Sequence, residues 1–114
     1  MFFSKNMAQI KKNSKNLKIL EYCTPQDHSH LPMDGAIAYF KTGSFGPKIN
    51  RNFTELFFIL EGALTIELED QVFKLEKDDL FIIPTGKKHT LFGHNAKLFI
   101  SCSPQFDPEN MEFL

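Results

Sequence analysis

A carboxylate and an imidazole flank the most apolar stretch of this chain, and both groups can do chemistry. Glu55 opens the run ELFFIL, and His89 follows the turn residues Pro84 and Gly86. Carboxylates and imidazoles are common general acids and bases, and both also bind transition metals. We therefore predict one ligand-binding or catalytic site, with Glu55 and His89 as its candidate catalytic groups.

Polar residues upstream of Glu55 could complete this site. A carboxylate inside a protein must either find a partner or become protonated. Lys48 or Arg51 could supply the neutralising cation, and the sequence leaves that choice open. Asn50 could bind the ligand through its amide, and Tyr39 could line the same cavity.

The remaining reactive residues are less well placed. His28 and His30 form an H-x-H pair in a loop bounded by prolines, so we expect them to face solvent. Cys23 and Cys102 are far apart in the sequence and form neither a disulfide framework nor a metal motif. We expect both to be reduced thiols.

Length and charge restrict the class of protein. The chain has 114 residues and a formal net charge of −1, which indicates one domain and gives no case for nucleic-acid binding. It has no run of 18 apolar residues and no secretory signal pattern, so we expect no membrane span and a cytoplasmic location. The first twenty residues contain five lysines and no acid. We divide the chain into a basic arm, residues 1–16, and a folded domain with a C-terminal tail, residues 17–114.

The hydrophobic pattern predicts an all-β fold. Apolar and polar residues alternate over 63–69 and 72–76, and turn residues separate the short apolar runs. Residues 54–60 are almost wholly apolar, so both faces of that strand should be covered. We expect a barrel or sandwich over about residues 17–103, with the tail packed outside. The side chains expected in its core are Leu64, Ile66, Leu68, Phe73, Leu75, Ile82, Leu98 and Ile100.

Two spaced motifs make residues 36–109 resemble the cupins, a family of small antiparallel, jelly-roll-like β-barrels. The cupin motifs run roughly G-x5-H-x-H-x3/4-E-x6-G and G-x5-P-x-G-x2-H-x3-N. Glu55-x6-Gly62 matches the end of the first, and Pro84-x-Gly86-x2-His89 matches the middle of the second. The resemblance implies a single-domain cupin barrel with its site inside.

The same resemblance implies that the usual metal site is degenerate. Cupins hold one metal with both histidines of H-x-H, the glutamate and the later histidine. Here the H-x-H positions are Lys48 and Asn50 in one register, or Ile49 and Arg51 in the other. We therefore expect no cofactor. If a metal did bind, it would be a divalent transition metal held by Glu55, His89 and Asn50.

Three functions remain in competition at this stage. The first is binding of a small polar ligand, such as a sugar or carboxylate, in the barrel. The second is an enzyme, either an isomerase or epimerase using Glu55 and His89 or a weak metal-dependent cupin enzyme. The third is a non-catalytic scaffold. We also expect a homodimer, because single-domain cupins commonly pair and because apolar residues lie at both termini: Phe2, Phe3, Phe113 and Leu114.

Overall fold

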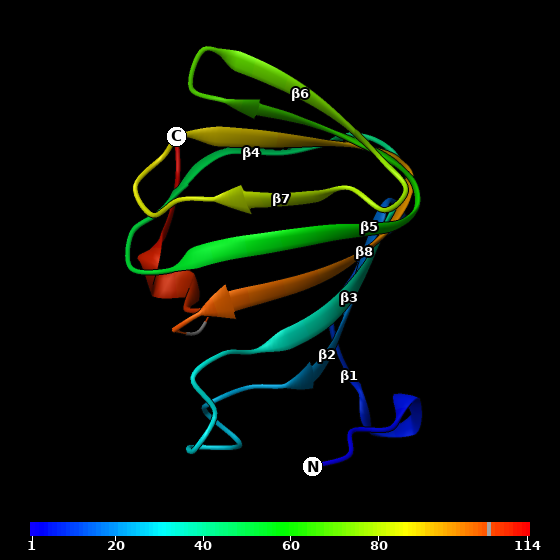
Figure 1. Ribbon diagram of the computed structural model, residues 1–114, viewed down its shortest axis with the longest axis vertical. Coiled ribbons are helices and arrows are strands. Elements are labelled where there is room, and N and C mark those ends of the chain that lie inside the picture. The colour runs from blue at the N-terminus through cyan, green and yellow to red at the C-terminus, as the bar shows by residue number, and fades with distance from the viewer. Residues whose placement is uncertain (105) are drawn as a thin grey trace.

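The computed structural model describes residues 1–104 and 106–114, and almost all of its regular structure is antiparallel strand. The predicted all-β fold is confirmed (Figure 1). Within these described ranges, neither of the two single-turn helices is long or apolar enough to cross a membrane. The elements are η1 (Lys5–Met7), β1 (Gln9–Asn13), β2 (Leu17–Cys23), β3 (Gly35–Phe40), β4 (Ser44–Asn50), β5 (Thr54–Leu68), β6 (Gln71–Glu76), β7 (Leu80–Ile83), β8 (His89–Ser103), η2 (Pro108–Asn110) and β9 (Met111–Phe113).

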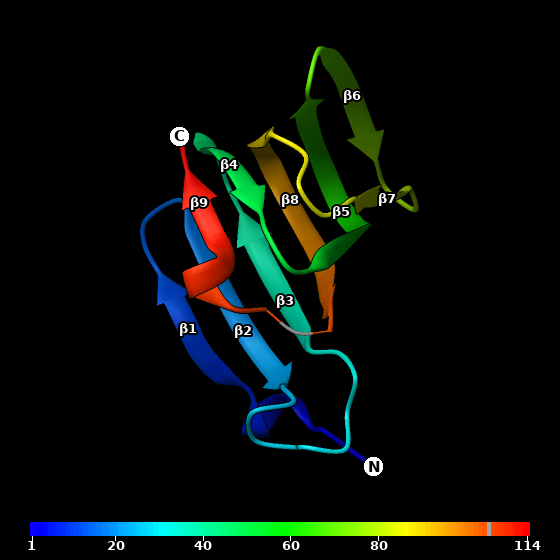
Figure 2. The ribbon, with the colours of Figure 1, turned by 90° about the vertical axis from the view of Figure 1, so that its left-hand side faces the viewer.

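Two long strands, β5 and β8, run through both layers of the barrel. Their halves 54–61 and 97–103 pair with each other, between β7 on one side and β3, β2 and β1 on the other. We call this layer the first sheet. Their other halves, 63–68 and 89–94, pair with each other between β6 and the strands β4 and β9, and form the second sheet. Figures 1 and 2 show how the sheet curls over where β5 and β8 bend.

The bends replace turns that the sequence suggests. Glu61-Gly62 and Gly93-His94-Asn95 carry turn residues, yet β5 and β8 continue through both positions, with register shifts in β5. Gly62 has a φ of +72°, and a Cβ there would lie 2.1 Å from the carbonyl oxygen of Asn95. A glycine is therefore required where the two strands bend together.

The core lies between the two sheets and follows the period-two pattern. Four of the eight expected core residues are buried, namely Leu64, Ile66, Leu75 and Leu98. Leu68, Phe73 and Ile100 are half-buried and pack against the core. The prediction for Ile82 is wrong, since 49% of it is exposed. Ile83 points inward on β7, so its neighbour Ile82 points to the outer face.

Both ends of the chain add strands to the barrel. Residues 9–13 lie within the expected basic arm but form β1, which pairs with β2. The tail does not pack outside as expected. Instead, β9 pairs with β4, and Phe106 packs edge-on against Phe53 with ring centroids 5.7 Å apart. Apolar residues of the tail thereby form part of the interior wall.

Candidate functional site

A cavity of about 530 Å³ lies between the two sheets. Most of its wall is apolar, with Phe40, Phe57 and Leu98 from the sheets and Met111 from the tail. Lys48, Glu55, Asp34 and Cys102 give it one polar region. A mainly apolar cavity of this size with a few polar groups is typical of small-molecule sites.

Strand register brings the predicted site residues together. Glu55 shares the inward parity of Phe57 and Ile59 on β5, and its partner on β8 is Cys102. Lys48 of β4 lies opposite His89, the first residue of β8. Asn50 and Lys48 are two residues apart on one strand and therefore share a face.

A buried ion pair forms the centre of the site. The Lys48 Nζ lies 3.6 Å from Glu55 Oε1, with side chains that are 2% and 8% exposed. Asn50 Nδ2 donates a hydrogen bond of 3.0 Å to the same carboxylate oxygen. The Lys48 ammonium also lies 4.8 Å from the centroid of the Phe45 ring. The structure thus selects Lys48 as the cation that neutralises Glu55.

His89 is held as a neutral ring beside this pair. Its Nδ1 lies 2.9 Å from the Lys87 carbonyl oxygen, which can only accept, so Nδ1 carries the proton. In the neutral ring, which the lowered pKa favours, the Nε2 atom has a free lone pair, and it has no hydrogen-bond partner among the described residues. Burial lowers the pKa of His89 below its ordinary value of 6.5, and the nearby Lys48 lowers it further. The Lys87 bond and Glu55 act in the opposite direction.

Asp34 and Cys102 belong to the site, although sequence reasoning did not place them there. The Asp34 carboxylate accepts hydrogen bonds from the backbone N–H groups of Cys102, at 2.8 Å, and Phe106, at 2.7 Å. Asp34 thereby ties the tail to the barrel. Burial raises the pKa of Asp34, and it raises the pKa of the Cys102 thiol far more, with Glu55 adding to the effect. Leu98 and Ile100 were expected to point inward, and Cys102 is the next residue on the same face of that strand, so its inward direction could have been predicted.

Tyr39 and Arg51 lie outside the cavity, in contrast to the expectation. Tyr39 lies between two inward residues of β3, so it points to the outer face, where Lys97 Nζ lies 5.6 Å from its ring centroid. Arg51 follows the inward Asn50, and its guanidinium donates to the Glu112 carboxylate at the surface. Neither side chain lines the cavity, and the buried Asn50 and His89 are also absent from its wall, although Asn50 donates to Glu55 and His89 lies opposite Lys48.

The residues around Glu55 do not fit the metal that the cupin resemblance implies. Asn50 turns its NH2 group toward Glu55, and the Lys48 ammonium lies beside the same carboxylate. A bound cation there would meet a fixed positive charge and an amide nitrogen that cannot coordinate. Within residues 1–104 and 106–114, no three or more His, Cys, Asp or Glu side chains are grouped to hold a metal.

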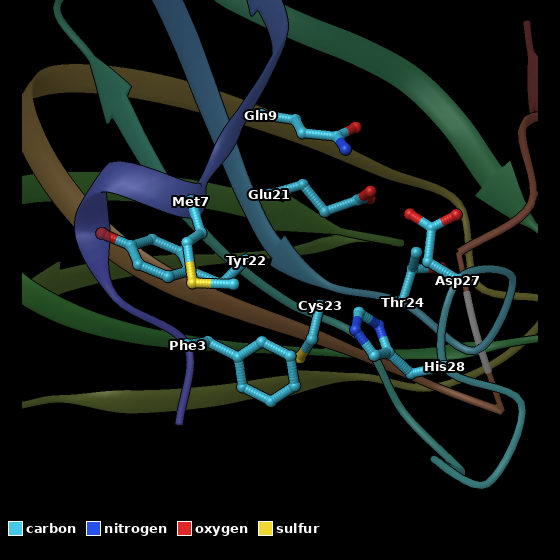
Figure 3. Close-up of a pocket in the computed structure, with 9 residues that line it drawn as sticks. All are labelled: Phe3, Met7, Gln9, Glu21, Tyr22, Cys23, Thr24, Asp27 and His28. Carbon is cyan, nitrogen blue, oxygen red and sulfur yellow. The ribbon is translucent and has the colours of Figure 1, made fainter. Parts of the chain in front are cut away.

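A second pocket of about 220 Å³ lies beside β2, under the N-terminal segment (Figure 3). Phe3 packs edge-on against His28 there, with ring centroids 5.0 Å apart. His28 is therefore half-buried rather than exposed as expected, whereas His30 is exposed. Glu21 and Thr24 line both pockets, so β2 and the residue after it separate them.

Comparison with known proteins identifies the family. Residues 36–97 match the family model described as the cupin domain, and because this match covers more than half of the chain, the protein belongs to that family. A comparison with curated proteins found no match.

Solved structures share the fold across large differences in sequence. Pac13, described as a unique nucleoside dehydratase, is 12% identical with a TM-score of 0.81, over 100% of this chain and 90% of its own. Streptomyces Pac13 variants were solved with uridine. KdgF from Halomonas sp. is 17% identical with a TM-score of 0.77, over 96% of this chain and 99% of its own. Bacillus subtilis oxalate decarboxylase OxdC is 16% identical with a TM-score of 0.80, over 98% of this chain and 32% of its own. At these identities the likeness shows the fold alone.

We predict that the Lys48 and Glu55 substitutions are strongly coupled. Lys48→Met leaves a buried carboxylate without its cation and should lower the free energy of unfolding by about 3–5 kcal/mol. Glu55→Gln leaves a buried ammonium without its carboxylate and should lower the free energy of unfolding by the same amount. The double variant should lose clearly less than the sum, because no unpaired charge remains. Urea denaturation measures all three. Arg51→Met is the control, since its surface pair with Glu112 should contribute no more than about 1 kcal/mol. Additive losses would show that the two charges do not depend on each other.

We also predict that His89 makes stability depend on pH. Its pKa is lower in the folded protein than the ordinary value of 6.5, so the unfolded chain takes up the proton first as the pH falls. Stability should therefore decrease as the pH falls through about 6.5, and His89→Gln should lack this contribution.

The measurement is the difference in unfolding free energy between wild type and His89→Gln from about pH 5 to 8. The raised pKa values of Asp34 and Glu21 contribute the opposite slope above their ordinary values of 3.8 and 4.5. Both carboxyl groups are present in both proteins, so the difference isolates His89. Parallel pH profiles for the two proteins would contradict the prediction.

Proposed function

We propose that this protein binds a small, uncharged polar molecule, such as a sugar or nucleoside, in the cavity between its sheets. The observation that carries the proposal is a cavity of about 530 Å³ whose polar region contains a buried, internally neutralised ion pair. The Lys48 ammonium can donate to a ligand hydroxyl, and Glu55 can accept from one. Apolar walls such as Phe57 and Leu98 suit the less polar face of the ligand.

The charges around the cavity favour an uncharged ligand over a carboxylate. Glu21, Asp34 and Glu55 line the cavity together with Lys11, Lys12 and Lys48, so acidic and basic residues are equal in number. Lys48 is already paired with Glu55, and Lys11 is paired with Glu21 at 3.6 Å. A carboxylate ligand would compete with these acids for the same cations. The Pac13 fold, which is similar and was solved with uridine, supports nucleosides as the first compounds to test.

A ligand panel tests the proposal directly. Nucleosides, neutral sugars and sugar acids would be titrated by calorimetry, and we expect a neutral compound to bind most tightly. Ala36→Leu extends a lining side chain into the cavity and should weaken binding about tenfold or more. Tyr39→Phe, on the outer face, is the control and should leave affinity unchanged. Binding that survives both Ala36→Leu and Lys48→Met would place the ligand elsewhere, and preference for a sugar acid would overturn the charge argument.

His89 favours acid–base catalysis as a second candidate function. Its neutral ring has an unpaired Nε2 atom, which is the form needed to accept a proton, and it lies opposite Lys48, which does line the cavity. Lys48 and Glu55, close by, could bind the substrate hydroxyl or carbonyl that reacts. The scaffold alternative is less well supported, because Phe57 lines the cavity without filling it.

Isotope exchange separates catalysis from binding. A ligand found in the panel would be incubated with the protein in deuterated water and followed by proton NMR. An enzyme of this kind should place deuterium on a carbon of the ligand, or eliminate water from it, and His89→Gln should abolish the change while affinity stays within about threefold. A ligand that binds but remains unchanged over many hours would leave binding as the function.

A further inference from the structure

A row of apolar side chains crosses the outer face of the first sheet. Strand register places these six residues side by side, one from each neighbouring strand: Leu80, Phe58, Phe99, Ile37, Leu20 and Ile10. We call them the outer row. Their chain neighbours, such as Phe57 and Leu98, point into the core, so the outer row points away from it. Leu80 is 55% exposed and Phe99 is 37% exposed.

The surroundings of the outer row extend this surface on one flank and limit it on the other. Ile82 and Leu56 lie beside each other two residues along their strands and lengthen the apolar surface. On the opposite flank, Lys97, Tyr39 and Lys18 are consecutive partners across three strands, and the exposed Glu61 of β5 is the partner of Lys97 on its other side. The surface therefore has an apolar centre and one charged flank, on which two lysines outnumber one glutamate.

The area of this face suits a small dimer interface. Six strands about 4.8 Å apart and about five residues of 3.3 Å each give roughly 500 Å² in projection, before side-chain relief is added. Standard interfaces bury about 800 Å² per partner, and monomers rarely expose apolar patches of more than a few hundred Å². The almost wholly apolar sequence of residues 54–60, in which Glu55 is the one charged residue, fits a strand that is covered on both faces.

We infer that the outer row is the interface between two copies of this chain, stacked face to face about a two-fold axis that runs along the row. Closed two-fold pairs are the commonest small assemblies. An axis along the row places the charged flanks of the two copies on opposite sides of the interface. An axis along the strands would instead gather both flanks on one side, where four lysines would face only two glutamates and the excess like charges repel.

This surface differs from the terminal residues that the sequence suggested. Phe113 packs edge-on against Phe45, with ring centroids 5.4 Å apart, and Phe3 packs against His28. These contacts cover part of the two side chains within one chain, whereas Phe2 and Leu114 stay 85% and 56% exposed at opposite ends of the chain. The dimer remains a prediction, and the outer row supplies the surface for it.

Light scattering tests the interface. Wild type should be a dimer at about 100 μM, and Phe99→Glu should weaken association at least 100-fold because it buries a charge at the centre. Leu80→Glu, at a more exposed site, serves as a second disrupting variant if Phe99→Glu folds poorly. Val72→Glu is the matched control, since Val72 is 59% exposed but lies on β6, away from the outer row. A monomeric wild type, or a dimer that survives both substitutions, would overturn the proposal.

Cysteine cross-linking tests the axis. In a Cys23→Ser background, Phe99→Cys should oxidise to a disulfide-linked dimer, because a residue on the axis meets its own copy. Lys97→Cys should not, because two-fold rotation about the row brings it opposite Ser101 instead. Faster cross-linking of Lys97→Cys than of Phe99→Cys would contradict an axis along the row.

Discussion

The buried pair of Lys48 and Glu55 is the constraint on which the rest of the structure depends. Two charges removed from water are tolerable only while they remain close together and hydrogen-bonded. Lys48 belongs to β4, and Glu55 opens β5, so their contact fixes how the second sheet meets the first. β4 in turn is held between β8 and β9. The tail that forms part of the cavity wall therefore also helps to hold the strand of the cation in position.

The fold could be predicted from the sequence where hydrophobic period and turn residues agree. Alternation over residues 63–76 predicted the hairpin of β5 and β6 and its inward side chains. It could not show that β5 and β8 bend at Gly62 and Asn95 rather than ending there, because bends and turns use the same residues. Residues 9–13 were missed as a strand, since all five side chains are exposed; backbone pairing with β2 and the Lys11–Glu21 ion pair hold them in place.

The candidate site could be predicted only where the sequence showed which side chains of a strand point inward. Glu55 and His89 followed from the motifs, but two registers made Lys48 and Arg51 equally suitable cations until β4 was seen to direct Lys48 inward. Tyr39 was placed wrongly because the parity of β3 was not used. Asp34 lies in a loop with no period at all, so only the three-dimensional structure could bring it to Cys102.

The central place of β8 also governs how the chain can fold. It separates β5 from β3 in one sheet and β5 from β4 in the other, yet it begins only at His89. Neither sheet can close until the last quarter of the chain is available. Pairings of such large sequence separation are slow to form. During synthesis on the ribosome, the apolar residues of β5 must wait in water for β8 to emerge, and such segments are the ones that chaperones protect from aggregation.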